Sequence, residues 1–139
     1  MFMINGINTS LSGLLAASTR ANTAANNIVN AYNTSTPVGG DTSTAAIHTS
    51  RAYVPQKVVN SSQQHGGVVA TKVPVNPSSL SVYSPDDPVA NEQGFVNIPN
   101  VDPAVEFSEL IKAKHAYKAN AAVLRTLYET QDAALDIIK

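Results

Sequence analysis

Apolar residues recur at helical spacing at both ends of the chain, and the longer run is C-terminal. Between residues 102 and 139, intervals of three and four trace a single seam, the pattern of helices that pack against other helices. This seam consists of Phe107, Leu110, Lys114, Tyr117, Ala121, Leu124, Tyr128, Gln131, Leu135 and Ile138. Asp102 can cap free N–H groups, and Pro103 suits the first helical position, so a helix is predicted to begin here. At full length it would span roughly 55 Å and would need another helix beside it.

A second long helix is predicted over residues 4–30. Its seam follows the same spacing through Ile4, Ile7, Leu11, Leu14, Ser18, Ala21, Ala25 and Ile28. Small seam residues in its later half let helices approach closely but bury little apolar area, which is worth ~25 cal/mol per Å². Many of the remaining residues are Asn, which is a mediocre helix former. The stability of this helix should therefore come from its neighbours.

The middle of the chain has a different character. Residues 33–44 have the composition of a linker, and short runs rich in Val, Thr and Tyr follow at 52–54, 57–59, 67–73 and 80–83. Pro and Gly separate these runs, which predicts short strands or extended pieces. We therefore expect a mainly α fold with a small β or irregular insert. The expected division is an N-terminal helix (1–32), a linker and insert (33–101) and a C-terminal helix (102–139).

The two terminal helices are expected to pair as an antiparallel α-helical coiled coil, with the insert at the far end. The simplest alternative is a helical hairpin that carries a decorative loop.

Composition narrows the function classes. The formal net charge is −1, without the basic excess of a nucleic-acid-binding protein, and the chain has no Cys.

No apolar run approaches the ~20 residues of a membrane-spanning helix. Residues 1–6 lack the features of a cleavable signal peptide. A helix lying on a membrane would need Lys and Arg along its polar face, where the N-terminal helix has only Arg20. We expect neither nucleic-acid binding nor direct membrane insertion.

Residues that could carry chemistry are few. His48, His65 and His115 are far apart, and none has a second ligand at helical spacing, so no metal site is expected. Glycines 66 and 67 could line an oxyanion hole, but no Gly-x-Ser-x-Gly elbow accompanies them. Asp86 and Asp87 form the only adjacent acid pair, and flanking prolines suggest a solvated turn. We expect no catalytic site and no cofactor.

Segments at opposite ends of the chain resemble the signatures of bacterial flagellar rod and hook proteins. The N-terminal match is SGLLAA at residues 12–17 with Arg20, followed by ANNIVNA at residues 25–31. The C-terminal match is FSELI at residues 107–111, followed by AKHAYKAN at residues 113–120. Between them, YSPDDPVANEQGFV at residues 83–96 is similar to the C-type basal-body rod proteins, which are small subunits of the proximal rod.

The resemblance implies a structural subunit of the flagellar basal-body rod rather than an enzyme. Such subunits are exported unfolded through the flagellar type III apparatus without signal cleavage. They assemble in the periplasm, through their terminal helices, into a helical tube that transmits torque. The implied partners are further copies of the chain, other rod proteins and the export apparatus.

The resemblance also implies an assembly interface on the terminal helices. The expected interface residues are Leu11, Leu14, Asn26, Asn27, Ile28, Asn30, Leu110, Tyr117, Asn120, Leu124, Tyr128 and Leu135. The asparagines are expected to hydrogen-bond within or between subunits and to fix the register of the helices. The alternative is that they lie on an exposed helix surface.

Two other functions stay open. One is an export-linked adaptor or junction protein of the same apparatus, and the other is a peptidoglycan-acting enzyme that uses Asp86 and Asp87.

Overall fold

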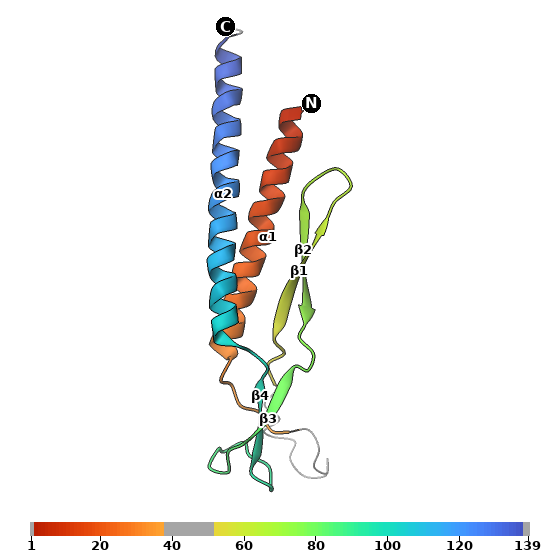
Figure 1. The fold of residues 1–139 in the computed structure, drawn as a ribbon, viewed down its shortest axis with the longest axis vertical. Coiled ribbons are helices and arrows are strands. Elements are labelled where there is room, and N and C mark those ends of the chain that lie inside the picture. Colours follow the sequence, from red (N-terminus) through yellow and green to blue (C-terminus); the bar gives the residue numbers. More distant parts are fainter. Residues whose placement is uncertain (1, 38–51, 138–139) are drawn as a thin grey trace.

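Two long helices and two small hairpins form an elongated molecule (Figure 1). The computed structural model describes residues 2–37 and 52–137. Its elements are α1 (Phe2–Asn30), β1 (Gln56–Ser62), β2 (Val68–Pro74), β3 (Ser79–Tyr83), β4 (Phe95–Pro99) and α2 (Pro103–Asp136). The mainly helical fold with a small β insert is therefore confirmed. Most of the predicted linker, together with His48, lies outside the described residues.

Helix α2 begins where the sequence predicts. The Asp102 carboxylate accepts hydrogen bonds from the backbone N–H groups of Ala104, at 2.9 Å, and Val105, at 3.4 Å. Pro103 occupies the first turn, where a missing N–H costs no helical hydrogen bond. The helix continues for 34 residues. It ends beyond the N-terminus of α1, so its last turns extend past α1 in Figure 1.

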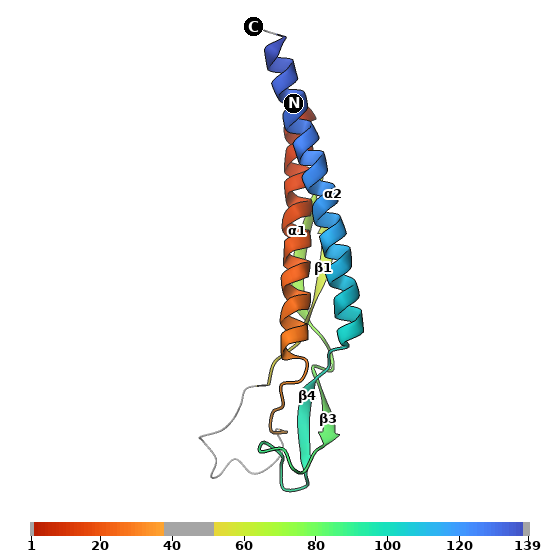
Figure 2. The same ribbon diagram turned by 90° about the vertical axis from the view of Figure 1, so that its left-hand side faces the viewer.

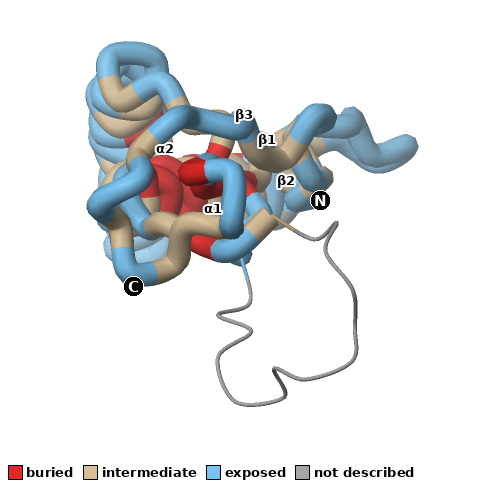
Figure 3. Tube along the Cα trace, turned by 90° about the horizontal axis from the view of Figure 1, so that it is seen from below, coloured by how far each residue is buried: buried red, intermediate tan, exposed pale blue. Residues whose placement is uncertain are grey.

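Helix α1 is the central element, with α2 on one side and the β1–β2 hairpin on the other (Figures 1 and 2). Buried residues gather along it, as Figure 3 shows, and all of them are small or polar. They are Ser10, Ala16, Ala17, Thr23, Ala24 and Asn27. A helix lined with such residues can be approached closely on two sides, but each contact buries little apolar area.

The helices run antiparallel, as expected, and meet along one regularly spaced line. A Cβ atom added at Gly6 would lie 3.3 Å from Leu127 Cδ1, and one added at Gly13 would lie 2.5 Å from Asn120 Oδ1. Towards the other end, Asn27 donates a hydrogen bond to Glu106. Seven residues forward on α1 correspond to seven residues back on α2, so these pairs share one register.

This line of contact differs from the predicted seams by one residue in each helix. On α2 the contact line follows residues 106, 113, 120 and 127, whereas the nearer-numbered row of the seam follows 107, 114, 121 and 128. On α1 the contact line likewise precedes the row at 7, 14, 21 and 28 by one residue. One residue corresponds to a rotation of about 100°. The predicted phase was wrong because periodicity weighs apolar bulk, whereas the backbones come closest where side chains are smallest. Ala113, for example, is the buried residue of α2.

The insert consists of two antiparallel hairpins. Strands β1 and β2 pair from Gln56↔Pro74 to Ser62↔Val68, and β3 and β4 pair from Ser79↔Pro99 to Tyr83↔Phe95. The extended runs at 57–59, 67–73 and 80–83 lie largely in β1, β2 and β3. The run at 52–54 is not a strand, and β4 was not predicted. Strand β4 has only five residues, follows Gly94 and ends at Pro99, so it has little periodicity to detect.

Only the β3–β4 hairpin lies wholly at the far end from the termini. The expectation for β1–β2 was wrong, because this hairpin folds back along α1 (Figures 1 and 2). Ser12 Oγ accepts a hydrogen bond from the backbone N–H of Val68 at 3.0 Å. Gly67 has φ +95°, and a Cβ there would lie 2.6 Å from Ser12 Oγ. The Gly66–Gly67 pair considered for an oxyanion hole is therefore the turn that docks the hairpin on α1.

We predict that Gly13→Leu lowers the free energy of unfolding, by about 1–3 kcal/mol, because the larger side chain must displace Asn120 and separate the helices. A second substitution, Asn120→Ala, should recover part of the loss. Urea denaturation followed by circular dichroism would measure both effects. Asn8→Leu, at an exposed position of α1, is the matched control. A Gly13→Leu variant as stable as the parent chain would contradict the close helix contact.

Candidate assembly interface

Asn27 joins three parts of the chain through a saturated set of hydrogen bonds. Its side chain is completely buried, with 0% exposure. Nδ2 donates to the backbone carbonyl of Gln56 at 2.7 Å and to Glu106 Oε1 at 2.8 Å. Oδ1 accepts from the Tyr53 hydroxyl at 2.7 Å and from the Gln56 backbone N–H at 3.1 Å. The end of α1, the start of β1 and the first turn of α2 are thereby held in one arrangement.

Two titratable side chains that hydrogen-bond to Asn27, Glu106 and Tyr53, have raised pKa values. Burial raises the pKa of Glu106 above its ordinary value of 4.5; the hydrogen bond from Asn27 lowers this pKa, and the charge of Glu109 raises it. Burial and the charge of Glu106 also raise the pKa of Tyr53, so its hydroxyl remains a donor at neutral pH. Arg20 on α1 lies 3.5 Å from Glu109. The two helices thus share an ion pair next to the junction.

The other predicted asparagines bond locally. Asn26 and Asn30 donate to the backbone carbonyls four residues earlier in α1, and Asn120 does the same in α2. Asn120 also lies against Gly13, so it occupies the contact line without a hydrogen bond across it. Among the predicted asparagines, the described structure joins separate elements by hydrogen bonds at Asn27 alone. A cross-element role cannot be read from sequence, because all four share a helical context.

The predicted apolar interface residues lie beside the helix contact line. Leu14, Ile28, Leu110 and Leu124 are half-buried. Leu11, Tyr117, Tyr128 and Leu135 are exposed, with 46%, 49%, 52% and 53% of their surface accessible. A single chain therefore leaves apolar side chains of both helices in contact with solvent.

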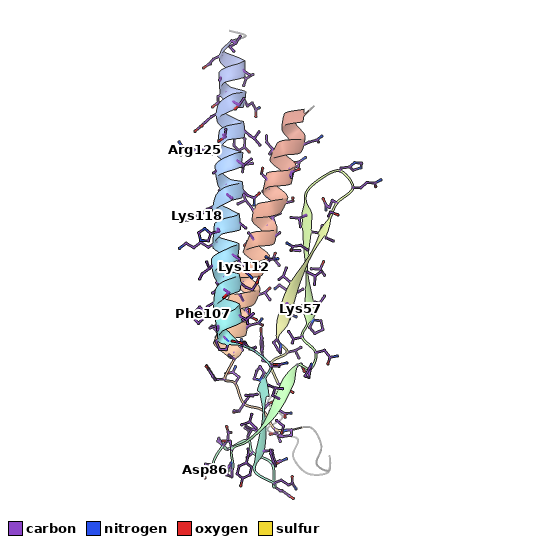
Figure 4. The ribbon with its side chains drawn as sticks, viewed as in Figure 1. Lys57, Asp86, Phe107, Lys112, Lys118 and Arg125 are labelled. Carbon is purple, nitrogen blue, oxygen red and sulfur yellow. The ribbon has the colours of Figure 1, made fainter. Side chains whose placement is uncertain are left out.

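Further exposed apolar residues were not predicted as interface residues. On α1 and just after it they are Leu15, Val29 and Tyr32, and on α2 and its C-cap they are Val105, Phe107, Ile111, Val123 and Ile137. Phe107 does belong to the predicted seam. In Figure 4 it lies on the side of α2 that points away from the hairpin. The sequence signal for the others was weak because they fall outside a single heptad seam.

The two predicted seams border one groove between the helices. Its volume is about 460 Å³, and no hairpin residue lines it. The lining residues are Ala17, Ser18 and Ala21 from α1, and Leu110, Ala113, Lys114, Tyr117 and Lys118 from α2. The floor is apolar, and two lysines stand at its rim. Residues of both seams therefore meet in this groove: Ser18 and Ala21 from α1, and Leu110, Lys114 and Tyr117 from α2.

The acidic pair at residues 86 and 87 lies far from the helices, at the end of the molecule, where Figure 4 labels Asp86. Asp87 Oδ1 accepts a hydrogen bond from the backbone N–H of Val89 at 3.0 Å, so this carboxylate stabilises its own turn.

Within residues 2–37 and 52–137, no three His, Cys, Asp or Glu side chains are grouped to hold a metal ion. Over the same ranges, no helix has the length and apolar character needed to cross a membrane.

Comparison with known proteins decides the family. Residues 92–137 match the family described as flagellar basal body rod FlgEFG protein C-terminal. A flagellar basal-body rod protein FlgC from Salmonella typhimurium is 33% identical over 128 residues, which cover 91% of each chain. The FlgC proteins of Yersinia enterocolitica (32% identity, 91% of this chain, 90% of the relative) and Borreliella burgdorferi (27%, 100% and 99%) are also similar. The chain belongs to the flagellar basal-body rod protein family.

Family membership confirms the resemblance and places the chain in the flagellar basal body as a structural rod protein. The structure gives two residues of the N-terminal motif a physical role. Ser12 and Gly13 are neighbours with different roles. Ser12 accepts a hydrogen bond from the β1–β2 hairpin, and Gly13 lets α2 approach α1 closely because it has no side chain. The matched C-terminal range begins just before β4, includes the Asp102 cap and covers α2 through Ile137.

We predict that Asn27→Ala lowers the free energy of unfolding by about 2–3 kcal/mol, because it leaves buried groups of Gln56 and Tyr53 without a partner. Asn26→Ala is a matched control, since that exposed side chain bonds only its own helix. Urea denaturation would compare the two. Equal losses for both variants would contradict the junction.

Glu106 should make stability depend on pH. Its pKa is raised in the folded chain, so between pH 4.5 and that value the folded form binds the proton more tightly than the unfolded form does. The group's contribution is fully present below pH 4.5 and is lost as the pH rises through the folded pKa. Glu106→Gln keeps an acceptor for Asn27, so it should raise stability at pH 7 and flatten the profile between pH 4.5 and 7. Thermal unfolding across this range would test it, with Glu129→Gln as control; unchanged slopes would refute the assignment.

Proposed function

We propose that this chain is a structural subunit of the proximal rod that assembles through its terminal helices. The supporting observation is the set of apolar side chains that a single chain leaves exposed on α1 and α2, including Phe107, Tyr117 and Leu135. In a helical assembly these side chains pack against neighbouring subunits. The coiled-coil contacts expected from the two seams then form between chains, beside the intramolecular line.

The thin interior supports an exported subunit. The largest fully buried side chains in the described ranges are Val96, Asn27 and Pro55, and the helix contact is made by small residues. Such a chain buries little apolar area on its own, so unfolding for passage through the flagellar type III apparatus costs little, and packing is gained on assembly. Torque then passes through packed helices, with no chemical step.

Two alternatives make different predictions. An export-linked adaptor or junction protein would be isolated with rods in substoichiometric amounts. A peptidoglycan-acting enzyme would lose muramidase activity when Asp86 and Asp87 are substituted. The turn-stabilising role of Asp87 already gives one of these carboxylates a structural task.

We predict that Phe107→Asp abolishes swimming and incorporation into the rod while the purified chain keeps its helicity. Phe107 is 55% exposed, so a charge there leaves the fold intact but is buried without a partner in the assembly. It is a cleaner probe than Leu124→Asp, because Leu124 is half-buried within the chain. Motility assays and immunoblots of purified basal bodies would read out the result.

Ala119→Asp is the matched control, at an exposed position of the same helix outside the seam. Normal incorporation of Phe107→Asp would exclude its face of α2 from the assembly interface. Loss of incorporation for both variants would point to a general effect of charge on α2.

A further inference from the structure

The C-terminal end of α2 is an exposed amphipathic segment whose last turns extend past α1. Every residue from 128 to 137 is exposed. In the register set by Gly6 with Leu127 and Gly13 with Asn120, the first residue of α1 lies level with residue 131 of α2. The last turns of α2 therefore project beyond α1, as Figure 1 shows. We call the exposed residues 128–137, which include these projecting turns, the overhang.

Apolar and acidic side chains follow the overhang at helical spacing. Tyr128 and Leu135 are one heptad apart and about half exposed. Asp132 and Asp136 are four residues apart, so they stand on one face, roughly 6 Å from each other. A surface complementary to this face would combine apolar side chains with two neighbouring cations.

The groove between α1 and α2 offers that surface. Leu110 and Tyr117, also one heptad apart, line it together with alanines of both helices. Lys114 and Lys118 stand at its rim with the same four-residue spacing as the two acids. Figure 4 shows Lys118 on the side of α2 that points away from the hairpin, where a neighbour can approach. The volume of about 460 Å³ lies within the range of pockets that accept apolar groups, roughly 300–1,000 Å³.

We propose that the overhang of one copy of this chain docks into the groove of a second copy, a contact that rests on the proposed rod function. A shift of 18 residues along α2, which is five helical turns and roughly 27 Å, brings the two patterns into register. Asp132 then lies level with Lys114, and Asp136 with Lys118. The same shift sets Tyr128 at Leu110 and Leu135 at Tyr117.

The contact is heterologous: the overhang and the groove are different surfaces, so each copy offers one of each. A heterologous contact that does not close into a ring propagates as an open helical assembly. One repeated interaction therefore sets both the direction of stacking and an axial step between copies. The lysine–aspartate pairs orient the helix, and the apolar stripe excludes water around them.

Charge reversal on the full-length chain tests the proposal. Asp132→Lys with Asp136→Lys, and separately Lys114→Asp with Lys118→Asp, should each weaken self-association at least about tenfold in sedimentation equilibrium at low salt. The four substitutions together restore complementary charge and should recover association. Asp86→Lys with Glu92→Lys, both exposed at the opposite end of the molecule, should leave self-association unchanged. Failure of the fourfold variant to recover, while its helicity is intact, would overturn the contact.

Disulfide trapping gives a second test of the contact that does not depend on charge. The natural chain has no Cys, so introduced cysteines are the only thiols. Leu135→Cys mixed with Ser18→Cys, which lines the groove, should form a crosslinked dimer under mild oxidation. Leu135→Cys mixed with Thr71→Cys, on the exposed hairpin, should not. Equal yields from both mixtures, or none from the first, would overturn the proposal.

Basal bodies separate this inference from the function on which it rests. Normal incorporation of both charge-reversed double variants, with the parent chain present in rods, overturns the overhang contact and leaves the rod assignment standing. Absence of the parent chain from purified rods defeats the rod assignment itself.

Discussion

The buried amide of Asn27 is the interaction on which the arrangement of this chain depends. An amide offers two donor hydrogens and an acceptor oxygen, and here a helix end, a strand start and a second helix start use all of this capacity. Because a buried amide without partners is costly, each of the three segments stabilises the position of the other two. A long loop-bearing insert can thus leave α1 and return to α2 while the two helices keep one register.

From that junction the helices extend with contacts that are close but shallow. Glycine, alanine and asparagine form the contact line, so the backbones approach while little apolar area is removed from water. The hairpin adds a similar contact on the opposite side of α1, through Ser12 and the glycine turn. The larger apolar side chains are displaced to the flanks. The fold therefore has a thin interior and leaves many of its larger apolar side chains at the surface.

The one-residue difference between the apolar seams and the contact line links the fold to the proposed function. Had the seams packed within the chain, a single chain would bury the apolar face of each helix and would present polar faces to its neighbours. With the smaller residues inside, the apolar ones remain available for other subunits. Family membership in the flagellar basal-body rod proteins agrees with such a design.

The amino-acid sequence by itself determined the helices, the start of α2 at Asp102 and Pro103, most of the strand-forming runs and the family. These depend on local chemistry: capping, periodicity, turn residues and short motifs. Tertiary structure alone decided which face of each helix meets the other, that Asn27 rather than Asn26 or Asn30 joins the elements, and that the β1–β2 hairpin lies along α1. These outcomes depend on how closely backbones approach and on which distant partners saturate a buried polar group. Both are properties of the packed chain, which no local pattern records.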